Sequence, residues 1–484
     1  MQLNSMRWQR VFGLAAGPTL FVLVHTLLPY ADMRMIVAIA VWMMAWWITE
    51  AVPIAVTALM PLVLFPLTGS VDIDTVSGAY GSKFVFLFLG GFLIALAMEK
   101  WHLHRRIALQ IVQRVGDRPN RIVLGFMLAS ALLSMWISNT ATALMMLPIA
   151  LSVIHLFRER FEHASDLRRF RLNMLLGLAY AANCGGIATL IGTPPNAAMA
   201  GIMSETFKVE IGFGSWMVIG LPFSMLLLWA VYISLTRWLH PMRGANRPSA
   251  GGENQIITNA LAQLGKPSIE ERRVLLVFLT TAGLWIFKDL INHLQPWLTL
   301  NDSSIGMLGG LLLFVTPAGS GKPLLEWDDT QRLPWGILLL FGGGMALANA
   351  LKACGVMDSI AGVFAGSPET GLFFITLSLV VAALFLTEVI SNLALVLVFV
   401  PVVGAIAEGM GVHPLHFTVP VTLAASCAFM LPMATPPNAI VFAGGDIKIA
   451  EMMRAGLVLN GVAIVLSVLF SQFVIPWWIA NVVN

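Results

Sequence analysis

Long apolar stretches follow one another along most of this chain, separated by short polar segments. They recur from 12–30 near the beginning to 456–480 near the end. Each is close to the ~20 residues that a helix needs to cross a hydrocarbon layer about 30 Å thick. The pattern therefore predicts an all-α polytopic membrane protein, with the lipid bilayer as its solvent.

Two apolar segments, 122–157 and 371–409, are too long for one crossing. Polar residues interrupt each near its middle, Ser138-Asn139-Thr140 in the first and Ser391-Asn392 in the second. Non-helical backbone at membrane depth must be buried in protein or line a cavity. We therefore predict two re-entrant helical hairpins, and the other apolar segments then give about eleven crossings.

Composition and charge support a membrane location and set an orientation. Hydrophobic residues make up 58% of the chain and charged residues 11%, which excludes an ordinary water-soluble fold. Arginines concentrate in 104–121 and 158–171, and the positive-inside rule places both stretches, with the N-terminus, in the cytoplasm. The net charge of +3 thus reflects orientation in the cell (inner) membrane and not nucleic-acid binding.

Three motifs occur twice in the same order, which indicates an internal repeat. An odd number of crossings in each copy would place the second copy upside down, as in inverted-repeat transporters. The motif pairs are Phe88-Leu89-Gly90-Gly91 with Leu340-Phe341-Gly342-Gly343, Ile137-Ser138-Asn139-Thr140-Ala141 with Ile390-Ser391-Asn392-Leu393-Ala394, and Thr193-Pro194-Pro195-Asn196-Ala197 with Thr435-Pro436-Pro437-Asn438-Ala439. The expected organisation is an N-terminal helix in 1–34, a first repeat in 35–240 (hairpin 122–157, broken helix 174–203), a cytoplasmic linker in 241–270, and a second repeat in 271–484 (hairpin 371–409, broken helix 417–445).

The proline pairs predict a broken helix in each half. Proline removes backbone donors and frees carbonyls one turn earlier, and these oxygens suit a hard cation such as sodium. The half-helix that starts after each break directs its N-terminal N–H groups into the site, which favours a carboxylate or sulfate. The neutral oxygen donors nearby are Ser134, Ser138, Asn139 and Thr193 in the first half, and Thr387, Asn392 and Thr435 in the second.

Other interpretations are weaker or stay open. An isolated Ser-Asn pair within a span commonly joins helices, but its duplication at matched positions favours a binding site. Glu50 and Glu388 are membrane-level carboxylates for which a functional and a structural role are equally compatible with the sequence. A channel or sensor would need a continuous polar pore or a signalling domain, and an enzyme would need a catalytic constellation. The sequence shows no continuous polar pore, no signalling domain and no such constellation, so no catalysis and no organic cofactor are expected.

The motifs resemble those of the divalent anion/sodium symporter family (DASS), which includes sodium-coupled dicarboxylate and citrate carriers. The resemblance covers nearly the whole chain. It rests on Trp47-Ile48-Thr49-Glu50-Ala51-Val52-Pro53, Ser138-Asn139-Thr140, Gly185-Gly186, Gly192-Thr193-Pro194-Pro195-Asn196, Thr387-Glu388, Ser391-Asn392 and Ala434-Thr435-Pro436-Pro437-Asn438. The resemblance implies a homodimer in which a transport domain slides past a scaffold domain in an elevator motion.

The resemblance also implies ligands. It assigns one sodium ion to Ser134, Ser138, Asn139 and Gly192, and a second to Thr387, Ile390, Asn392 and Ala434. It assigns the anion to Asn139, Thr140, Ser391 and Asn392, supported by Thr193, Thr435 and Pro436. One departure is Leu393, which stands where the family often has threonine, so a hydroxyl donor to one carboxylate is missing.

The expected function is therefore sodium-coupled symport of C4-dicarboxylates such as succinate, malate or fumarate across the cytoplasmic membrane. An exchanger, or a sulfate or tricarboxylate carrier on the same fold, remains an open alternative because cargo choice depends on fine ligand placement.

Overall fold

The computed structural model describes residues 2–115, 118–158, 161, 163–242, 253–295, 297–365, 371–444 and 447–483. Helices dominate this part of the chain, and its only β contact is an isolated bridge between Pro317 and Pro323. Up to residue 242 the elements are α1 (Gln2–Leu27), α2 (Ala31–Thr49), α3 (Ile54–Thr57), α4 (Met60–Leu67), α5 (Ile73–Tyr80), α6 (Lys83–Lys100), α7 (Leu103–Val115), α8 (Pro119–Ser134), α9 (Asn139–Phe157), α10 (Ala164–Ile187), α11 (Pro194–Phe207), α12 (Phe213–Ile233) and the π-helical η1 (Ser234–Leu239).

The rest of the described chain is equally helical, and a short helix, α13, lies inside the predicted linker. Its elements are α13 (Glu253–Gln263), α14 (Ile269–Leu294), α15 (Asp302–Val315), η2 (Trp327–Arg332), α16 (Trp335–Ala353), α17 (Val356–Phe364), α18 (Leu372–Thr387), α19 (Asn392–Gly409), α20 (Leu415–Ala425), α21 (Pro436–Ala443), α22 (Ile449–Leu469), η4 (Phe470–Val474), α23 (Ile475–Trp478) and η5 (Ile479–Val483).

Six helical stretches of the described chain are long and apolar enough to cross a membrane. Eight shorter apolar helices of 10–17 residues accompany them, among them α8, α18 and α20. Eleven crossings would require several of these shorter helices to span as well, so the number of crossings stays a prediction. The six stretches are Ile73–Lys100, Phe213–Leu239, Ile269–Leu294, Trp335–Ala353, Asn392–Gly409 and Ile449–Val483.

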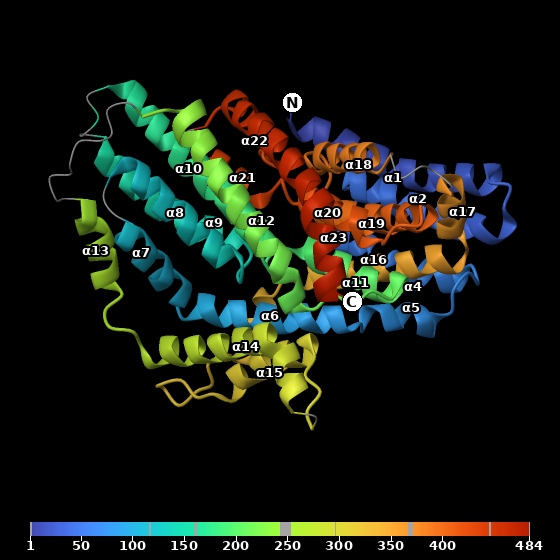
Figure 1. Ribbon diagram of the computed structural model, residues 1–484, viewed down its shortest axis with the longest axis horizontal. Coiled ribbons are helices and arrows are strands. Elements are labelled where there is room, and N and C mark those ends of the chain that lie inside the picture. Colours follow the sequence, from blue (N-terminus) through green and yellow to red (C-terminus); the bar gives the residue numbers. More distant parts are fainter. Residues whose placement is uncertain are drawn as a thin grey trace.

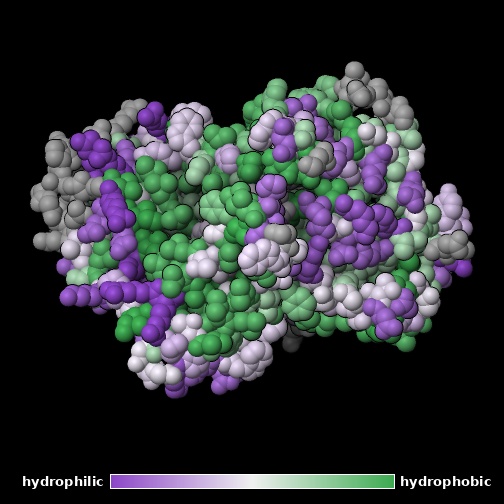
Figure 2. Space-filling view, turned by 60° about the horizontal axis from the view of Figure 1, so that its bottom comes forward, coloured by the Kyte–Doolittle hydropathy of each residue, from purple (hydrophilic) through white to green (hydrophobic). Residues whose placement is uncertain are grey.

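The surface carries many exposed apolar side chains, as expected of a protein in lipid. Phe12 on α1 and Leu276 on α14 are 70% and 66% exposed. Figure 2 shows a face on which hydrophobic side chains cover a broad area at the left and centre, while hydrophilic side chains gather along the left margin and in the right half. These findings support a multi-pass membrane protein.

The helices adjoining the two proline pairs form the centre of the molecule. Every α10 residue from Leu172 to Ile187 is buried, and so is nearly every residue of α11 and α20. Around this centre, α8, α9 and α12 pack against α10 and α22 packs against α12, whereas α16 to α19 gather with α1 and α2 at the other end (Figure 1). The interrupted helices are therefore enclosed by other parts of the protein.

Elements from the two halves of the chain cross over one another at this centre. The first-half helices α9 and α10 pack against the second-half helix α21, and the first-half helix α11 packs against α19 and α20. The two halves are thus interlocked, and each contributes to the surroundings of the other's proline motif.

The repeated Gly-Gly motifs lie at close helix contacts. A Cβ added to Gly90 on α6 would collide with the backbone of Gly306 on α15, and one added to Gly343 on α16 would collide with the backbone of Ala58. Glycine permits this separation because it has no side chain. These glycines therefore allow neighbouring helices to pack closely.

The basic helix α7, within the arginine-rich region near residue 104, packs against α8 and α13. Arg106 on α7 is buried and donates to the carboxylate of Glu271 on α14, with 2.8 Å between Nε and Oε2. Arg106 also donates to the carbonyls of Leu264 and Gly265. This basic residue therefore anchors the end of the linker to the first half.

Candidate functional site

The first polar interruption forms a tight turn between α8 and α9. Ser134 is the last residue of α8, and its hydroxyl donates to Oδ1 of Asn139, the first residue of α9, over 2.5 Å. Ser138 caps α9, and its hydroxyl accepts from the backbone N–H of Ala141 at 3.2 Å. These local hydrogen bonds fix the Asn139 side chain at the tip of the turn.

The first broken helix lies directly behind this turn. Helix α10 ends at Ile187 and α11 begins at Pro194, so 188–193 are not helical. A Cβ on Gly186 would lie 2.6 Å from Asn139 Oδ1, and one on Gly192 would lie 2.5 Å from the Gly186 carbonyl oxygen. The glycines of the motif thus let the turn and the break approach each other closely.

Buried side chains bond part of the freed backbone in and beside this break. The amide of Asn196 donates to the carbonyls of Gly186, Ile187 and Thr189 at 2.8–3.2 Å. The hydroxyl of Thr189 donates to the Met135 carbonyl at 2.6 Å and accepts from the N–H of Gly192 at 3.0 Å. Thr189 therefore connects the break to the hairpin turn.

The second hairpin turn repeats this arrangement. Thr387 ends α18, and its hydroxyl lies 2.8 Å from Oδ1 of Asn392, which begins α19. The same hydroxyl lies 2.7 Å from the Ala425 carbonyl at the end of α20. Ser391 precedes α19 but its side chain makes no capping hydrogen bond, and Leu393 is buried at 6% exposure. The hydroxyl–asparagine pair is therefore common to both halves.

The second break is held by a buried carboxylate. Helix α20 ends at Ala425 and α21 begins at Pro436. Glu388, 3% exposed, accepts from the backbone N–H groups of Phe429, Met430 and Leu431 at 2.9–3.1 Å. The side-chain amide of Asn460 on α22 also donates to Glu388, at 2.8 Å. Four donors thus surround this carboxylate.

Asn438 matches Asn196 in position and makes similar hydrogen bonds in the second break. Its amide donates to the carbonyls of Ala428 and Leu431, both at 3.1 Å. Both asparagines are fully buried. Each Pro-Pro-Asn motif therefore supplies a donor for carbonyls at the end of the preceding helix or within the break.

Direct contacts connect the first-half and second-half motifs. The amide of Asn183 on α10 donates to the hydroxyl of Thr435 at 3.0 Å. The hydroxyl of Tyr180 donates to the Phe429 carbonyl at 2.9 Å. Thr193 and Thr435 occupy matching extended N-cap positions, and both are buried. The structure thereby brings the second break against the first broken helix.

Three of the predicted ligands are backbone oxygens, and like several other carbonyls in the two breaks, those of Ile191 and Met433 among them, they accept no hydrogen bond from the described part of the chain. They are the carbonyls of Gly192, Ile390 and Ala434. Their neighbours in the breaks are used by Asn196 and Asn438. Gly192 is buried and Ile390 and Ala434 are partly exposed, so these oxygens are available to a ligand or to water.

The structure brings some of the predicted site residues together and leaves others apart. Direct contacts join Ser134 to Asn139 and Thr387 to Asn392. Thr140 and Ser391 are partly buried beside these pairs, and Pro436 is exposed. No hydrogen bond between described residues connects Asn139 with Asn392. Each hydroxyl–asparagine pair is therefore closed by hydrogen bonds within its own turn.

The site is neutral apart from Glu388. No group of three or more His, Cys, Asp or Glu side chains that could hold a metal occurs among the described residues. Cys184 and Cys427 are buried free thiols. The other candidate side chains carry hydroxyl and amide groups, which could bind ions without changing protonation state.

Sequence reasoning missed several residues that complete the site. Thr189, Asn183 and Asn460 were not singled out, and Glu388 was left between two roles. Asn196 and Asn438 had a usable signal, because each stands three residues after the motif threonine that precedes its helix. The partners of Glu388 lie about 40 and 72 residues away along the chain, and no local pattern reveals them.

The fold and these paired breaks define a multi-pass membrane protein with the internal discontinuities of secondary transporters. Residues 5–483 match the family model described as "Sodium:sulfate symporter transmembrane region", and the chain belongs to this family. The family predicted from the motifs is thus confirmed.

Curated relatives agree over nearly the full length. The chain is 39% identical over 481 residues to the "Sodium-dependent dicarboxylate transporter SdcS" of Staphylococcus saprophyticus, covering 96% of this chain and 92% of the relative. It is 36% identical to the protein of the same name from Staphylococcus aureus strain USA300, covering 96% and 91%.

A solved structure shares the overall fold. The Alcanivorax borkumensis YdaH transporter superposes with a TM-score of 0.55, covering 92% of this chain and 98% of that chain, at 12% sequence identity. At this identity the likeness concerns the fold alone.

Proposed function

We propose that this protein is a secondary active transporter that imports C4-dicarboxylates together with sodium across the cell membrane. The observation that carries the proposal is the pair of hydroxyl–asparagine centres, each beside backbone carbonyls that accept no hydrogen bond from the described chain. Unwound carbonyls at broken helices are characteristic sodium ligands in transporters. The names of the curated relatives support both sodium and dicarboxylate as cargo.

The first proposed sodium ion binds Ser134, Ser138, Asn139 and the Gly192 carbonyl. The second binds Thr387, Asn392 and the carbonyls of Ile390 and Ala434. Ser134 and Thr387 each donate to an asparagine oxygen, which leaves hydroxyl lone pairs free for a cation. Asn196 and Asn438 support this role because they satisfy the neighbouring carbonyls and so set the shape of each break.

The proposed anion site is built from Asn139, Thr140, Ser391 and Asn392, with support from Thr193, Thr435 and Pro436. Helices α9, α11, α19 and α21 all begin at these motifs. Their N-terminal dipole ends favour a dicarboxylate, and two sodium ions would offset its charge. All binding groups are neutral, so the site would hold cargo without covalent chemistry.

Several finer features belong to the same proposal. They are the two re-entrant hairpins, the inverted repeats in 35–240 and 271–484, the cytoplasmic N-terminus, the homodimer and the elevator motion. The crossing of α9 with α21 and of α11 with α19 supports a shared site between the repeats. Elevator motion would carry this interlocked centre as one body past the outer helices.

Sulfate is a second candidate cargo, because the family description names sulfate and Leu393 removes one hydroxyl from the site. The decisive test is uptake of labelled succinate by liposomes containing the purified protein. We expect accumulation with an inward sodium gradient and none in potassium alone, and excess unlabelled sulfate should compete weakly. Uptake that requires only internal dicarboxylate would instead identify an exchanger, and strong sulfate competition would reassign the cargo.

A further inference from the structure

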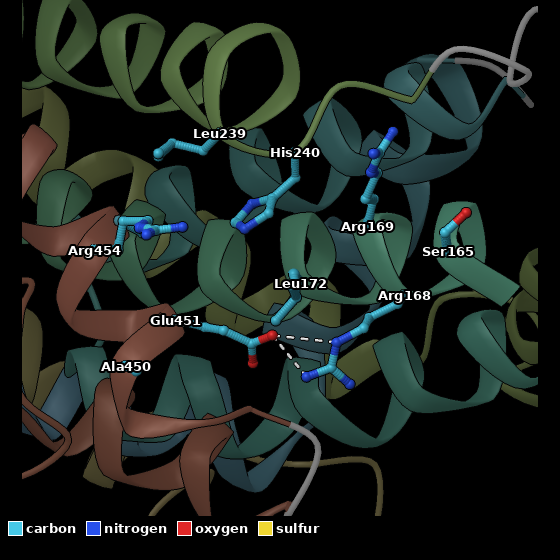
Figure 3. Close-up of a pocket in the computed structure, with 10 residues that line it drawn as sticks. Ser165, Arg168, Arg169, Leu172, Leu239, His240, Ala450, Glu451 and Arg454 are labelled. Carbon is cyan, nitrogen blue, oxygen red and sulfur yellow. Dashed lines mark hydrogen bonds and ion pairs between the residues drawn. The ribbon is translucent and has the colours of Figure 1, made fainter.

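A cavity of about 470 Å³ lies between α10, η1 and the beginning of α22, apart from the paired motifs. None of the residues assigned to sodium or cargo lines it. Figure 3 shows the cavity with its side chains drawn as sticks. The lining residues are Ser165, Arg168, Arg169, Leu172, Leu239, His240, Ala450, Glu451, Arg454 and Ala455.

The lining carries three arginines and one carboxylate, so its formal charge is +2 with histidine neutral. The carboxylate is already engaged. Glu451 accepts from Arg168 at 2.6 Å through Oε1 and from the backbone N–H of Lys448 at 2.9 Å through Oε2. It therefore offsets the charge of Arg168, while Arg169 is paired with Asp166 beside the cavity and Arg454 has no acidic partner among the described residues.

Arg454 is the most available of these groups. It is exposed, and no described residue forms a hydrogen bond or ion pair with it. Figure 3 shows its side chain extending toward His240. Arg169 lies at the rim, where it donates to the Pro241 carbonyl at 2.9 Å and lies 3.6 Å from Asp166. Arginine suits phosphate because its planar donors match phosphate oxygens.

His240 adds a second available group. Its Nδ1 atom is buried and has no hydrogen-bond partner among the described residues. Burial lowers the pKa of His240 and outweighs the opposing effect of Glu451, so the ring is neutral at neutral pH. The backbone here is fixed, because buried Asn173 donates to the His240 carbonyl at 3.0 Å. The cavity therefore has a fixed wall, and its buried His240 Nδ1 atom is available for a hydrogen bond.

An apolar stripe borders the charged cavity. Ile449, Met453 and Leu457 lie at intervals of four on α22 and are 51%, 39% and 54% exposed. Residues four apart share one face of a helix, and this face adjoins the one that carries Arg454. Trp238, 68% exposed, lies on the adjacent element η1. A ligand in the cavity would therefore contact both cationic groups and lipid-facing surface.

We propose that this cavity binds the phosphate group of an anionic phospholipid, with an acyl chain along Ile449, Met453 and Leu457. Arg454 and Arg169 contact the phosphate, and His240 supplies a further hydrogen bond. Basic pockets between membrane helices are suited to anionic headgroups. A soluble phosphate shares the headgroup chemistry but would leave the apolar stripe unused, which is why we favour the lipid.

The test titrates the purified full-length protein in detergent with phosphatidylglycerol or with phosphatidylcholine of the same acyl chains, and counts bound lipid by native mass spectrometry. We expect phosphatidylglycerol to bind more tightly, and Arg454→Gln to weaken it about five- to tenfold. Arg121→Gln is the matched control, since Arg121 is also exposed but does not line the cavity. Phosphatidylcholine binding should be unchanged in both variants.

Three results would overturn the proposal. The first is equal binding of the two lipids, and the second is an equal loss in the Arg454→Gln and Arg121→Gln variants. The third is stabilisation of the lipid-free protein by inorganic phosphate, abolished by Arg454→Gln, without any preference for phosphatidylglycerol. That result would assign the cavity to a soluble anion. Size-exclusion profiles establish that each variant is folded, and Arg454→Lys should retain part of the preference if charge is the cause.

Discussion

The two halves of the site use the same motif, yet they satisfy their broken helices differently. The first break spans six residues, 188–193, and the second spans ten, 426–435. In the first, the neutral Asn196 amide donates to the Thr189 carbonyl, and the Thr189 hydroxyl accepts from the backbone N–H of Gly192. In the second, Glu388 accepts from three consecutive backbone N–H groups. The longer break therefore depends on the buried carboxylate of Glu388.

The cause of this difference is the number of backbone groups that each break leaves without a hydrogen-bond partner. A ten-residue interruption exposes more backbone N–H groups, and at membrane depth no water is available to accept from them. A carboxylate has four lone-pair sites and can accept from several donors at once. Met135 stands at the first-half position that matches Glu388, where only its backbone carbonyl takes part. The two halves can therefore share the positions of their proposed ligands while different residues hold the two breaks in place.

The largest expected effect comes from removing either tip asparagine. Asn139→Ala or Asn392→Ala removes an amide proposed to contact both a sodium ion and the anion. Two interactions of about 1.5–3 kcal/mol each would be lost, which corresponds to about a 100-fold or greater fall in sodium-driven succinate uptake. Uptake into liposomes measures the effect.

The matched control is Asn481→Ala, because Asn481 is exposed and bonds only to the Trp477 carbonyl. It should transport normally. The assignment of both centres would have to be abandoned if the two tip variants, folded to the same extent, also transported normally. Unequal losses would show which half dominates.

A smaller, asymmetric effect is expected for Glu388→Gln. Glutamine places an N–H₂ group against backbone donors, so at least one hydrogen bond to a charged acceptor is lost. We expect the second break to loosen, with a loss of stability of about 1.5–3 kcal/mol and about a tenfold or greater rise in the sodium concentration for half-maximal uptake. Thermal unfolding and sodium titration of uptake measure the two quantities.

Glu408→Gln makes the same chemical change at an exposed position on α19 and should alter neither quantity. The interpretation of Glu388 as the support of the second break requires that sodium dependence and stability change together. A variant with wild-type values for both would refute it.

The smallest expected effect concerns the single position at which the tip motifs differ. Leu393→Thr adds the hydroxyl that Thr140 supplies in the first half, and Thr140→Leu removes it. One hydrogen bond of about 0.5–1.5 kcal/mol would change the preference between succinate and sulfate about two- to tenfold, in opposite directions for the two variants. Competition assays give this ratio. An unchanged ranking of anions would show that residue 393 does not face the cargo.

The sequence was sufficient to predict the all-helical membrane class, the family and the residues at the interruptions. Apolar length and proline pairs are local signals, and the physics behind them, membrane thickness and lost backbone donors, acts on neighbouring residues. The helices indeed end at Ser134, Ile187, Thr387 and Ala425, beside the polar and proline motifs. Which of these residues bind cargo stays a prediction.

The supporting contacts could not be predicted because they connect distant parts of the chain. Asn183 meets Thr435, Asn460 meets Glu388, and Arg106 meets Glu271 only after the halves have packed together. A single asparagine or arginine in the sequence carries no mark of its partner. The arginine cavity is a similar case, since its lining comes from α10, η1 and α22.

The crossed packing of the halves has a consequence for the covalent continuity of the chain. Because α9 and α10 hold α21, and α19 and α20 hold α11, the polypeptide between Met242 and Glu253 is not the main tie between the halves. If the two halves are expressed as separate fragments divided at this point, we expect them to associate in the membrane and form the native fold. A protease cut at that point would leave one working particle, not two.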